Sequence, residues 1–190
     1  MRLMRLLRTH GFLAALIAMA ACQPKEQPQE GQPSEPGAAA QTDEWTVSAH
    51  GYGPIRAGMT LAEAAQAGGR PFGEPQMGSE ECDYFLFADD TPRGSAHFMV
   101  INGQIARVDV NDSTIRTAEG ARMGDSEQRI QEIYPGRVTV QPHKYSDGHY
   151  LVVTSPADSG FSIIFETDGQ KVTTYRAGRM PEVEYVEGCS

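Results

Sequence analysis

The sequence predicts an α+β fold made of two tandem repeats, each a helix followed by an antiparallel meander. The repeats are expected to share one core, with helices covering one face of the sheet. Two landmarks that recur at the same offset support this prediction. The segment 58–60 (Gly-Met-Thr) recurs at 124–126 (Gly-Asp-Ser), and the turn 102–104 (Asn-Gly-Gln) recurs at 168–170 (Asp-Gly-Gln). Landmarks that share one offset are typical of a duplicated unit.

The offset also sets the expected boundaries. Repeat one is predicted over about residues 51–116, repeat two over about residues 117–182, and a C-terminal tail over residues 183–190. A short alternating strand at residues 45–49 precedes repeat one, so the predicted domain covers residues 45–190.

Repeat one contains local start and stop signals. Thr60 and Glu63 form a capping box at a helix start, and the glycine pair at residues 68–69 ends that helix. Asn-Gly at residues 102–103 lies between two apolar runs, which predicts a hairpin because both residues tolerate positive φ. The predicted strands are residues 84–87, 96–101 and 104–110.

Repeat two follows the same plan. Ser126 is expected to cap a helix whose apolar positions are Ile130, Ile133 and Tyr134, and the Pro-Gly pair at residues 135–136 ends it. The predicted strands are residues 138–141, 149–154, 161–167 and 171–176, with a last strand at 183–186. Because each helix can cover only one face of its sheet, the other face is expected to be a broad open surface.

The first 21 residues predict an export signal. Three arginines within residues 1–8 precede an apolar run, residues 11–21, that is too short to span a bilayer. The run ends in Met19-Ala20-Ala21-Cys22, which resembles the signal of bacterial lipoproteins. The resemblance implies that Cys22 is lipidated and that Gln23 directs the protein to the outer membrane, facing the periplasm. An ordinary secretory signal, with Cys22 as a free thiol, is the alternative.

Residues 22–44 are expected to form a disordered tether. They are rich in Gln, Pro, Glu, Gly, Ser and Ala and show no apolar periodicity. Such a segment buries too little apolar surface to offset the entropy of ordering the chain.

The charge of the chain limits its partners. The first 21 residues contain three arginines and no acidic residue, so removing them changes the formal net charge from −9 to −12. This sign opposes binding to nucleic acid and to anionic headgroups, so membrane contact is expected only through a lipid anchor. A protein or a neutral glycan is left as the expected partner of a monomeric chain.

The two late cysteines predict a structural disulfide. Cys82 and Cys189 form an even pair in an exported chain, and they lack the spacing of a redox or metal pair. Their bridge would tie the C-terminal tail to repeat one. Arg56 and Arg122, before the two predicted helices, and Arg107 and Arg176, in predicted third strands, are expected to form salt bridges with acidic side chains; contact with a ligand is the alternative.

A family resemblance adds to these inferences. The segment 58–60 before a short helix, its copy at 124–126 and the repeat order resemble the superfamily of β-lactamase-inhibitor-protein-like and small outer-membrane-assembly lipoproteins. The resemblance implies paired helices behind an antiparallel sheet whose exposed face or loops bind another protein.

The candidate binding site lies in the second repeat. Residues 143–150 combine imidazole, phenol, ammonium and carboxylate groups on a predicted turn, and the candidates are His143, Lys144, Tyr145, Asp147, His149 and Tyr150. Such side chains are typical of protein interfaces. A polar hairpin loop without a binding role is an equal alternative. A metal site at His143, Asp147 and His149 is less favoured, because their spacing matches no ligand frame.

No sequence motif supports catalysis or a cofactor. The chain contains neither Gly-x-Ser-x-Gly nor a phosphate-binding glycine loop. We therefore expect a non-catalytic, envelope-tethered module that recognises a protein partner. The alternatives are a lectin-like glycan binder, with Trp45, Tyr145 and Tyr150 as stacking platforms, and a hydrolase with dispersed catalytic residues.

Overall fold

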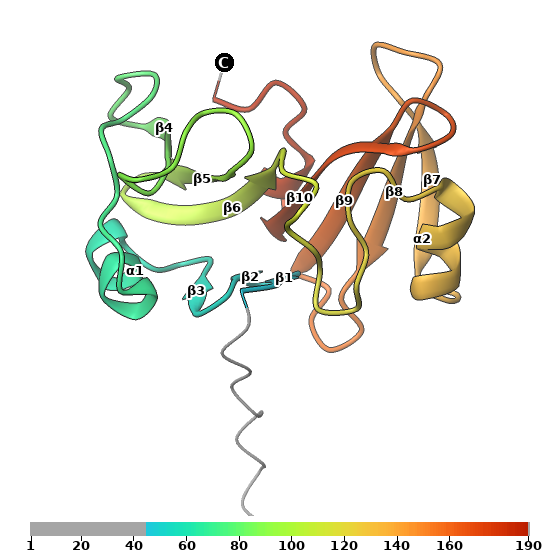
Figure 1. Cartoon of the computed structure of the whole chain (residues 1–190), viewed down its shortest axis with the longest axis horizontal. Coiled ribbons are helices and arrows are strands. Elements are labelled where there is room, and N and C mark those ends of the chain that lie inside the picture. Colours follow the sequence, from blue (N-terminus) through green and yellow to red (C-terminus); the bar gives the residue numbers. More distant parts are fainter. Residues whose placement is uncertain (1–44, 190) are drawn as a thin grey trace, which may run out of the picture. The chain divides into compact units, whose positions relative to one another are not determined.

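A seven-stranded antiparallel sheet is the largest element of the computed structural model, with strand order β4-β5-β6-β10-β9-β8-β7 (Figure 1). The structure describes residues 45–189, so the predicted export signal, the lipidation residue Cys22 and the tether (22–44) lie outside the described residues. The strands are β4 (Cys82–Phe85), β5 (Ala96–Ile101), β6 (Gln104–Val110), β7 (Val138–Pro142), β8 (His149–Thr154), β9 (Phe161–Thr167) and β10 (Val172–Arg179).

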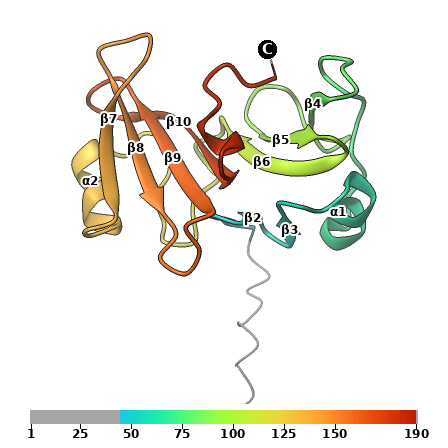
Figure 2. The same ribbon diagram turned by 180° about the vertical axis from the view of Figure 1, so that it is seen from behind.

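Two short helices and a small sheet complete the fold. The small antiparallel sheet consists of β1 (Val47–Ser48), β2 (Gly51–Tyr52) and β3 (Ile55–Arg56). Helix α1 (Leu61–Gly68) lies on the side of β4 to β6, and α2 (Glu127–Ile133) lies beside β7 and β8 (Figures 1 and 2). The fold is therefore broadly α+β, with more strand than helix.

The helix boundaries follow the local signals in the sequence. The Thr60 hydroxyl accepts a hydrogen bond from the Glu63 N–H, and a Glu63 carboxylate oxygen accepts one from the Thr60 N–H at 2.8 Å. Gly69 adopts the left-handed conformation, with φ 65°, and ends α1. Ser126 caps α2 by accepting a hydrogen bond from the Arg129 N–H at 3.1 Å. The predicted helix starts are confirmed.

The two predicted hairpins differ in their turns. Asn102 (φ 51°) and Gly103 (φ 79°) form a two-residue connection between β5 and β6, as expected for Asn-Gly. The connection between β9 and β10 is longer, because pairing resumes only at Thr167 opposite Val172. The predicted start of that strand at residue 171 is therefore one residue early.

The two glycine segments make the same contacts with the sheet. The Gly58 N–H donates to the Ile105 carbonyl at 2.8 Å, and the Ile105 N–H donates to the Met59 carbonyl at 2.8 Å. The Gly124 N–H donates to the Val172 carbonyl at 2.9 Å, and Val172 donates back to the residue after Gly124 at 2.9 Å. Both glycines have positive φ, 93° and 88°, a conformation that favours glycine. Each segment thus bonds to the beginning of a hairpin's second strand, β6 or β10, just before its helix starts.

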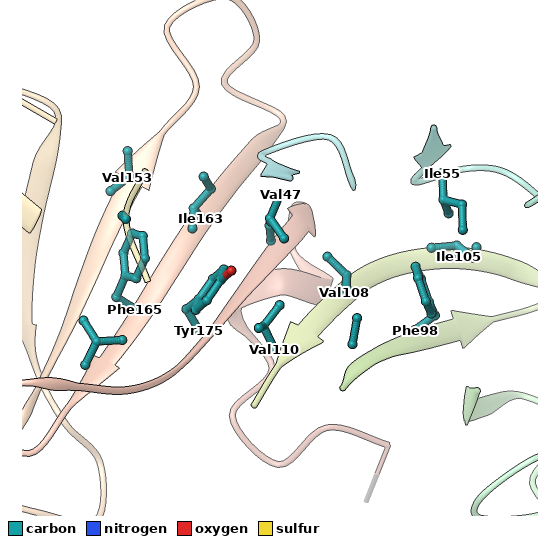
Figure 3. Packing of buried hydrophobic residues seen from close by; sticks show 14 of the residues in the cluster. Val47, Ile55, Phe98, Ile105, Val108, Val110, Val153, Ile163, Phe165 and Tyr175 are labelled. Carbon is teal, nitrogen blue, oxygen red and sulfur yellow. The ribbon is translucent and has the colours of Figure 1, made fainter. Parts of the chain in front are cut away.

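The main core lies on one face of the seven-stranded sheet. Side chains from β5, β6, β9 and β10 point into the same cluster, and residues of the small sheet pack over them (Figure 3). Its members include Val47, Ile55, Phe98, Val108, Val110, Phe165 and Tyr175. Full burial of one such side chain contributes about 1.5–3 kcal/mol. The strands of the two predicted repeats form one continuous sheet, because β6 pairs directly with β10.

The opposite face of the sheet is not open, which corrects the sequence prediction. The C-terminal tail crosses it toward β4 (Figure 1). Val183 is fully buried there in a second cluster with Tyr150, Val152 and Ile164. The predicted strand at 183–186 is absent from the described residues, where a 3-10 helix, η1 (Glu182–Glu184), stands instead. Arginine side chains, rather than a neighbouring strand, bind the carbonyl groups of this tail.

Candidate functional site

The disulfide between Cys82 and Cys189 fixes the end of the tail. Their Cα atoms lie 5.4 Å apart, and the bridge spans a sequence separation of 107 residues. The predicted pairing is therefore present, and it joins the tail to the first residue of β4.

Arg107 connects this tail to the sheet. Its side chain is almost fully buried, with 3% exposure, and donates to the carbonyls of Glu182 at 2.9 Å and Tyr185 at 2.7 Å. It also donates to Asp109 at 2.9 Å and to the Tyr84 hydroxyl at 2.7 Å. The guanidinium thus holds two strands and the tail together through its fixed fork of donors.

Arg176 has the matching role on β10. Its Nε donates to the Val183 carbonyl at 2.6 Å, and it forms an ion pair with Glu166. The predicted pairing with acidic side chains is confirmed for Arg107 and Arg176. The prediction missed that both arginines also bind the tail backbone. The Arg56 guanidinium donates to the carbonyls of Gly53 and Ile55.

The six candidate residues of the predicted site do not form one cluster. Residues 143–148 form the β7–β8 loop, and β8 begins at His149. Successive residues of a strand point to opposite faces, so His149 and Tyr150 lie on different faces of the sheet. Tyr150 belongs to the cluster with Val183, on the tail side.

On the tail side, His143 is held on both edges of its ring. The Tyr145 N–H donates to its Nδ1 at 3.1 Å, which leaves Nε2 as the donor toward Glu166, 3.5 Å away. The ring also stacks on Tyr150, with 4.6 Å between centroids and 22° between planes. The Lys144 N–H donates to the Tyr150 hydroxyl at 3.4 Å. These contacts fix the first half of the β7–β8 loop.

Tyr145 projects from this fixed loop. Its exposure is 61%, the largest among the exposed large hydrophobic residues. The Lys144 ammonium lies 4.9 Å from the Tyr145 ring centroid and 3.0 Å from a Glu187 carboxylate oxygen. The loop therefore contacts the C-terminal tail at Glu187, next to Tyr145.

His149 lies on the other face of the sheet, where it contacts the first residue of α2. Its Nδ1 donates to Glu127 at 2.8 Å, and the Thr167 hydroxyl donates to the same carboxylate oxygen at the start of α2. Burial opposes ionisation of Glu127, but these two hydrogen bonds prevail and lower its pKa. Asp147 is exposed. His143, Asp147 and His149 thus do not converge, and no metal-binding group of three such side chains exists within residues 45–189.

Trp45 does not provide a stacking platform. It packs edge-on against Tyr52 and Phe87, with centroid distances of 5.0 and 5.7 Å. It also covers Gly53, where an added Cβ would lie 2.7 Å from the indole ring. Trp45 is partly buried and Tyr150 is buried, so Tyr145 is the only one of the three predicted platforms that is exposed.

An open pocket of about 370 Å³, with both polar and apolar groups in its walls, lies where four strands meet on the tail side of the sheet, and sequence reasoning missed it. It is lined by Gln76, Tyr84, His97, Asp109, Val110, Asn111 and Thr174. Burial raises the pKa of Tyr84 to about 12. Burial also raises the pKa of Asp109, although the Arg107 guanidinium opposes this change. The available signal was the alternation of polar with apolar residues in β5, β6 and β10.

Comparisons with known proteins leave the family open. No protein-family model matches the chain, and no curated protein does. An uncharacterized protein, yfeY, from Escherichia coli is similar in structure, with a TM-score of 0.47 and 18% identity over 70% of this chain and 99% of that one. An extracellular protein containing an SCP domain from Bacillus anthracis is similar with a TM-score of 0.44 and 9% identity, over 79% of this chain and half of that one.

The helices of the described part of the chain are short. Neither α1 nor α2 nor any other helix within residues 45–189 has the length and apolar character needed to cross a membrane.

Proposed function

We propose that the chain is a non-catalytic binding module, tethered to the bacterial envelope, that recognises a protein partner through Tyr145. The observation that carries this proposal is a largely exposed tyrosine on a loop whose backbone is bonded in place. Tyrosine offers a large, rigid contact area and a hydroxyl, and such residues often dominate the energy of an interface.

The fixed loop supports this proposal energetically. A flexible loop loses conformational freedom on binding, which costs about 0.5–1.5 kcal/mol for each side chain that is immobilised. The His143 and Tyr150 contacts have already ordered the loop in the free protein. Lys144 and Glu187 provide a charged rim next to the ring. A rim of this kind steers a partner more than it adds affinity.

Location and ancestry belong to the same proposal. An export signal over residues 1–21, lipidation of Cys22 and a tether over 22–44 would place the module at the outer membrane, facing the periplasm. The matching contacts of Gly58 and Gly124 with the sheet support a duplication. The same contacts support kinship with the β-lactamase-inhibitor-protein-like and small outer-membrane-assembly lipoproteins.

Site-specific photo-crosslinking tests the proposed surface. Tyr145 is replaced by benzoylphenylalanine in the full chain, expressed in the bacterial envelope, and Tyr185, exposed by 42% on the tail, serves as the matched control. We expect a discrete protein adduct from position 145 that is weak or absent from position 185. The same adducts from both positions, or none from position 145, would contradict the proposal.

The affinity of the crosslinked partner provides the quantitative test. Tyr145→Ala is expected to cost about 2 kcal/mol of binding, roughly a thirtyfold increase in Kd. Its effect on stability is expected to stay within about 0.5 kcal/mol, because the side chain is exposed. Tyr150→Ala is unsuitable for this test, because Tyr150 has only 6% exposure and its removal would disturb the core.

A further inference from the structure

The open pocket on the tail side, called the cavity below, combines apolar wall groups with a few polar side chains, as ligand sites do. Its walls come from four strands, with Tyr84 on β4, His97 on β5, Asp109 on β6 and Thr174 on β10. Its volume, about 370 Å³, lies within the range of small-molecule pockets, about 300–1,000 Å³. Side chains on strands of one sheet are held more rigidly than side chains on loops.

Hydrogen bonds within the protein leave specific polar atoms available in this cavity. The Tyr84 hydroxyl accepts from Arg107 at 2.7 Å, so its own proton is left to donate. Asp109 Oδ2 accepts a hydrogen bond from Arg107 Nε at 2.9 Å, and Asp109 Oδ1 has no hydrogen bond within the described residues. The Thr174 hydroxyl donates to the Val110 carbonyl at 2.8 Å, so its oxygen can still accept a hydrogen bond from a ligand.

Amide groups extend this set at the rim. The Gln76 side-chain N–H₂ donates to the Glu74 carbonyl at 3.1 Å, which leaves the Gln76 carbonyl oxygen as an acceptor. Asn111 lies 3.2 Å from His97 Nε2 and holds that ring in place. The cavity thus offers donors and acceptors side by side, as hydroxyl-rich ligands require.

The local charge excludes strongly ionic ligands. The Asp109 carboxylate is neutralised by Arg107, which is buried and occupied by four acceptors. A cation would be repelled by the Arg107 guanidinium that lies behind the carboxylate, and an anion would be repelled by the Asp109 carboxylate itself. A neutral ligand avoids both penalties. Vicinal hydroxyl groups can donate to Asp109 Oδ1 and accept from Tyr84 at the same time.

We propose that this cavity binds one ring of a neutral sugar, with Asp109, Tyr84 and Gln76 as its hydrogen-bonding residues. Asp83 prepares the site, because its buried carboxylate accepts the N–H groups of Gln76 at 2.9 Å and Tyr84 at 2.7 Å. The two wall segments are therefore in place before a ligand arrives. This site is separate from the Tyr145 surface, so its failure would leave the protein-binding proposal untouched.

Saturation-transfer NMR on the full chain in a detergent without a sugar headgroup tests the proposal. The probes are the methyl glycosides of glucose, galactose, mannose and N-acetylglucosamine, and a second arm uses β-linked oligosaccharides of the same sugars. We expect transfer to at least one methyl glycoside. If the natural source is a glycan end, its oligosaccharide binds more tightly than the methyl glycoside; if it is a free sugar, the two bind alike.

Matched variants connect binding to the cavity. Tyr84→Phe removes one hydroxyl and Gln76→Ala one amide, and each is expected to weaken binding about tenfold. Tyr185→Phe removes a hydroxyl outside this cavity and is expected to bind as the wild type does. Near-ultraviolet circular dichroism confirms that each variant is folded. No transfer to any probe, or equal affinity in Tyr84→Phe, Gln76→Ala and the wild type, would overturn the proposal.

Discussion

Replacing Arg107 by methionine tests whether one guanidinium holds the tail on the sheet. The change removes four hydrogen bonds, two of them to tail carbonyls and one to Asp109. Removing one partner of a buried ion pair costs about 3–5 kcal/mol, because the other charge stays uncompensated. The Asp109 side chain keeps 27% exposure, so water can partly replace the lost donor. We therefore expect the lower end, about 3 kcal/mol less free energy of unfolding.

The pH dependence of this loss follows from Asp109. Burial raises its folded-state pKa above the ordinary value of 3.8, despite the opposing Arg107. The favourable contribution of a carboxyl group with a raised pKa is complete below the unfolded pKa and disappears as the pH rises through the folded pKa. In Arg107→Met, protonation of Asp109 removes the uncompensated charge. The difference in free energy of unfolding between the wild type and Arg107→Met is therefore expected to become smaller as the pH falls from about 7 to about 4.

Urea denaturation of the wild type, Arg107→Met, Asp109→Asn and the double variant measures these quantities. The double variant is expected to lose less than the sum of the two single losses, by about 1 kcal/mol or more, because the two side chains form one network. Additive losses, or a loss below about 1 kcal/mol in Arg107→Met, would refute the reasoning.

Two further variants test the tail and the cavity wall. Replacing Cys82 and Cys189 together by serine opens a loop with a sequence separation of 107. By chain entropy this lowers the free energy of unfolding by about 4–5 kcal/mol, measured by urea midpoints with thiol titration as the control. Asp83→Asn is expected to cost about 2–3 kcal/mol at about pH 7, since the carboxylate accepts several backbone N–H groups that an amide serves only in part. Burial opposes ionisation of Asp83, but those hydrogen bonds prevail and lower its pKa. The contribution of Asp83 to the free energy of unfolding is therefore complete at a pH above the ordinary pKa of 3.8, and it disappears as the pH falls through the folded-state pKa. An equal gap from the wild type at about pH 7 and about pH 2 would contradict this assignment.

The features that could be predicted from the sequence are local ones. The capping box at Thr60, the Asn-Gly turn at residues 102–103 and the end of α1 at Gly69 each depend on a few neighbouring residues. The disulfide was predictable for a different reason: once Cys22 is assigned to the export segment, Cys82 has a single possible partner.

The features that could not be predicted depend on contacts between distant residues. Nothing local in residues 182–186 indicates that the carbonyl groups of Glu182 and Tyr185 meet Arg107, more than 70 positions earlier. Val183 and its neighbours alternate as a strand would, and tertiary contacts override that pattern. The cavity was missed for the same reason, because its lining residues come from four strands and two adjoining loop positions that become neighbours only in the fold.

The division of the predicted loop was within reach of the sequence. His149 and Tyr150 are adjacent in a predicted strand, and period-two alternation already places them on opposite faces. The prediction placed residues 143–150 on one turn, although the last two of them belong to the strand β8, where they lie on opposite faces of the sheet. The structure assigns His149 to the start of α2 and Tyr150 to the tail side.

The central position of β10 has a consequence for the order in which the protein can be assembled. This strand, Val172–Arg179, is the last strand within residues 45–189, yet it joins β6 to β9 in the middle of the sheet. Until it has left the ribosome, β6 presents an unpaired backbone edge that can recruit strands of other chains. Chains that end before β10 are therefore expected to aggregate, because the long-range pairing of β6 with β10 can form only late in synthesis.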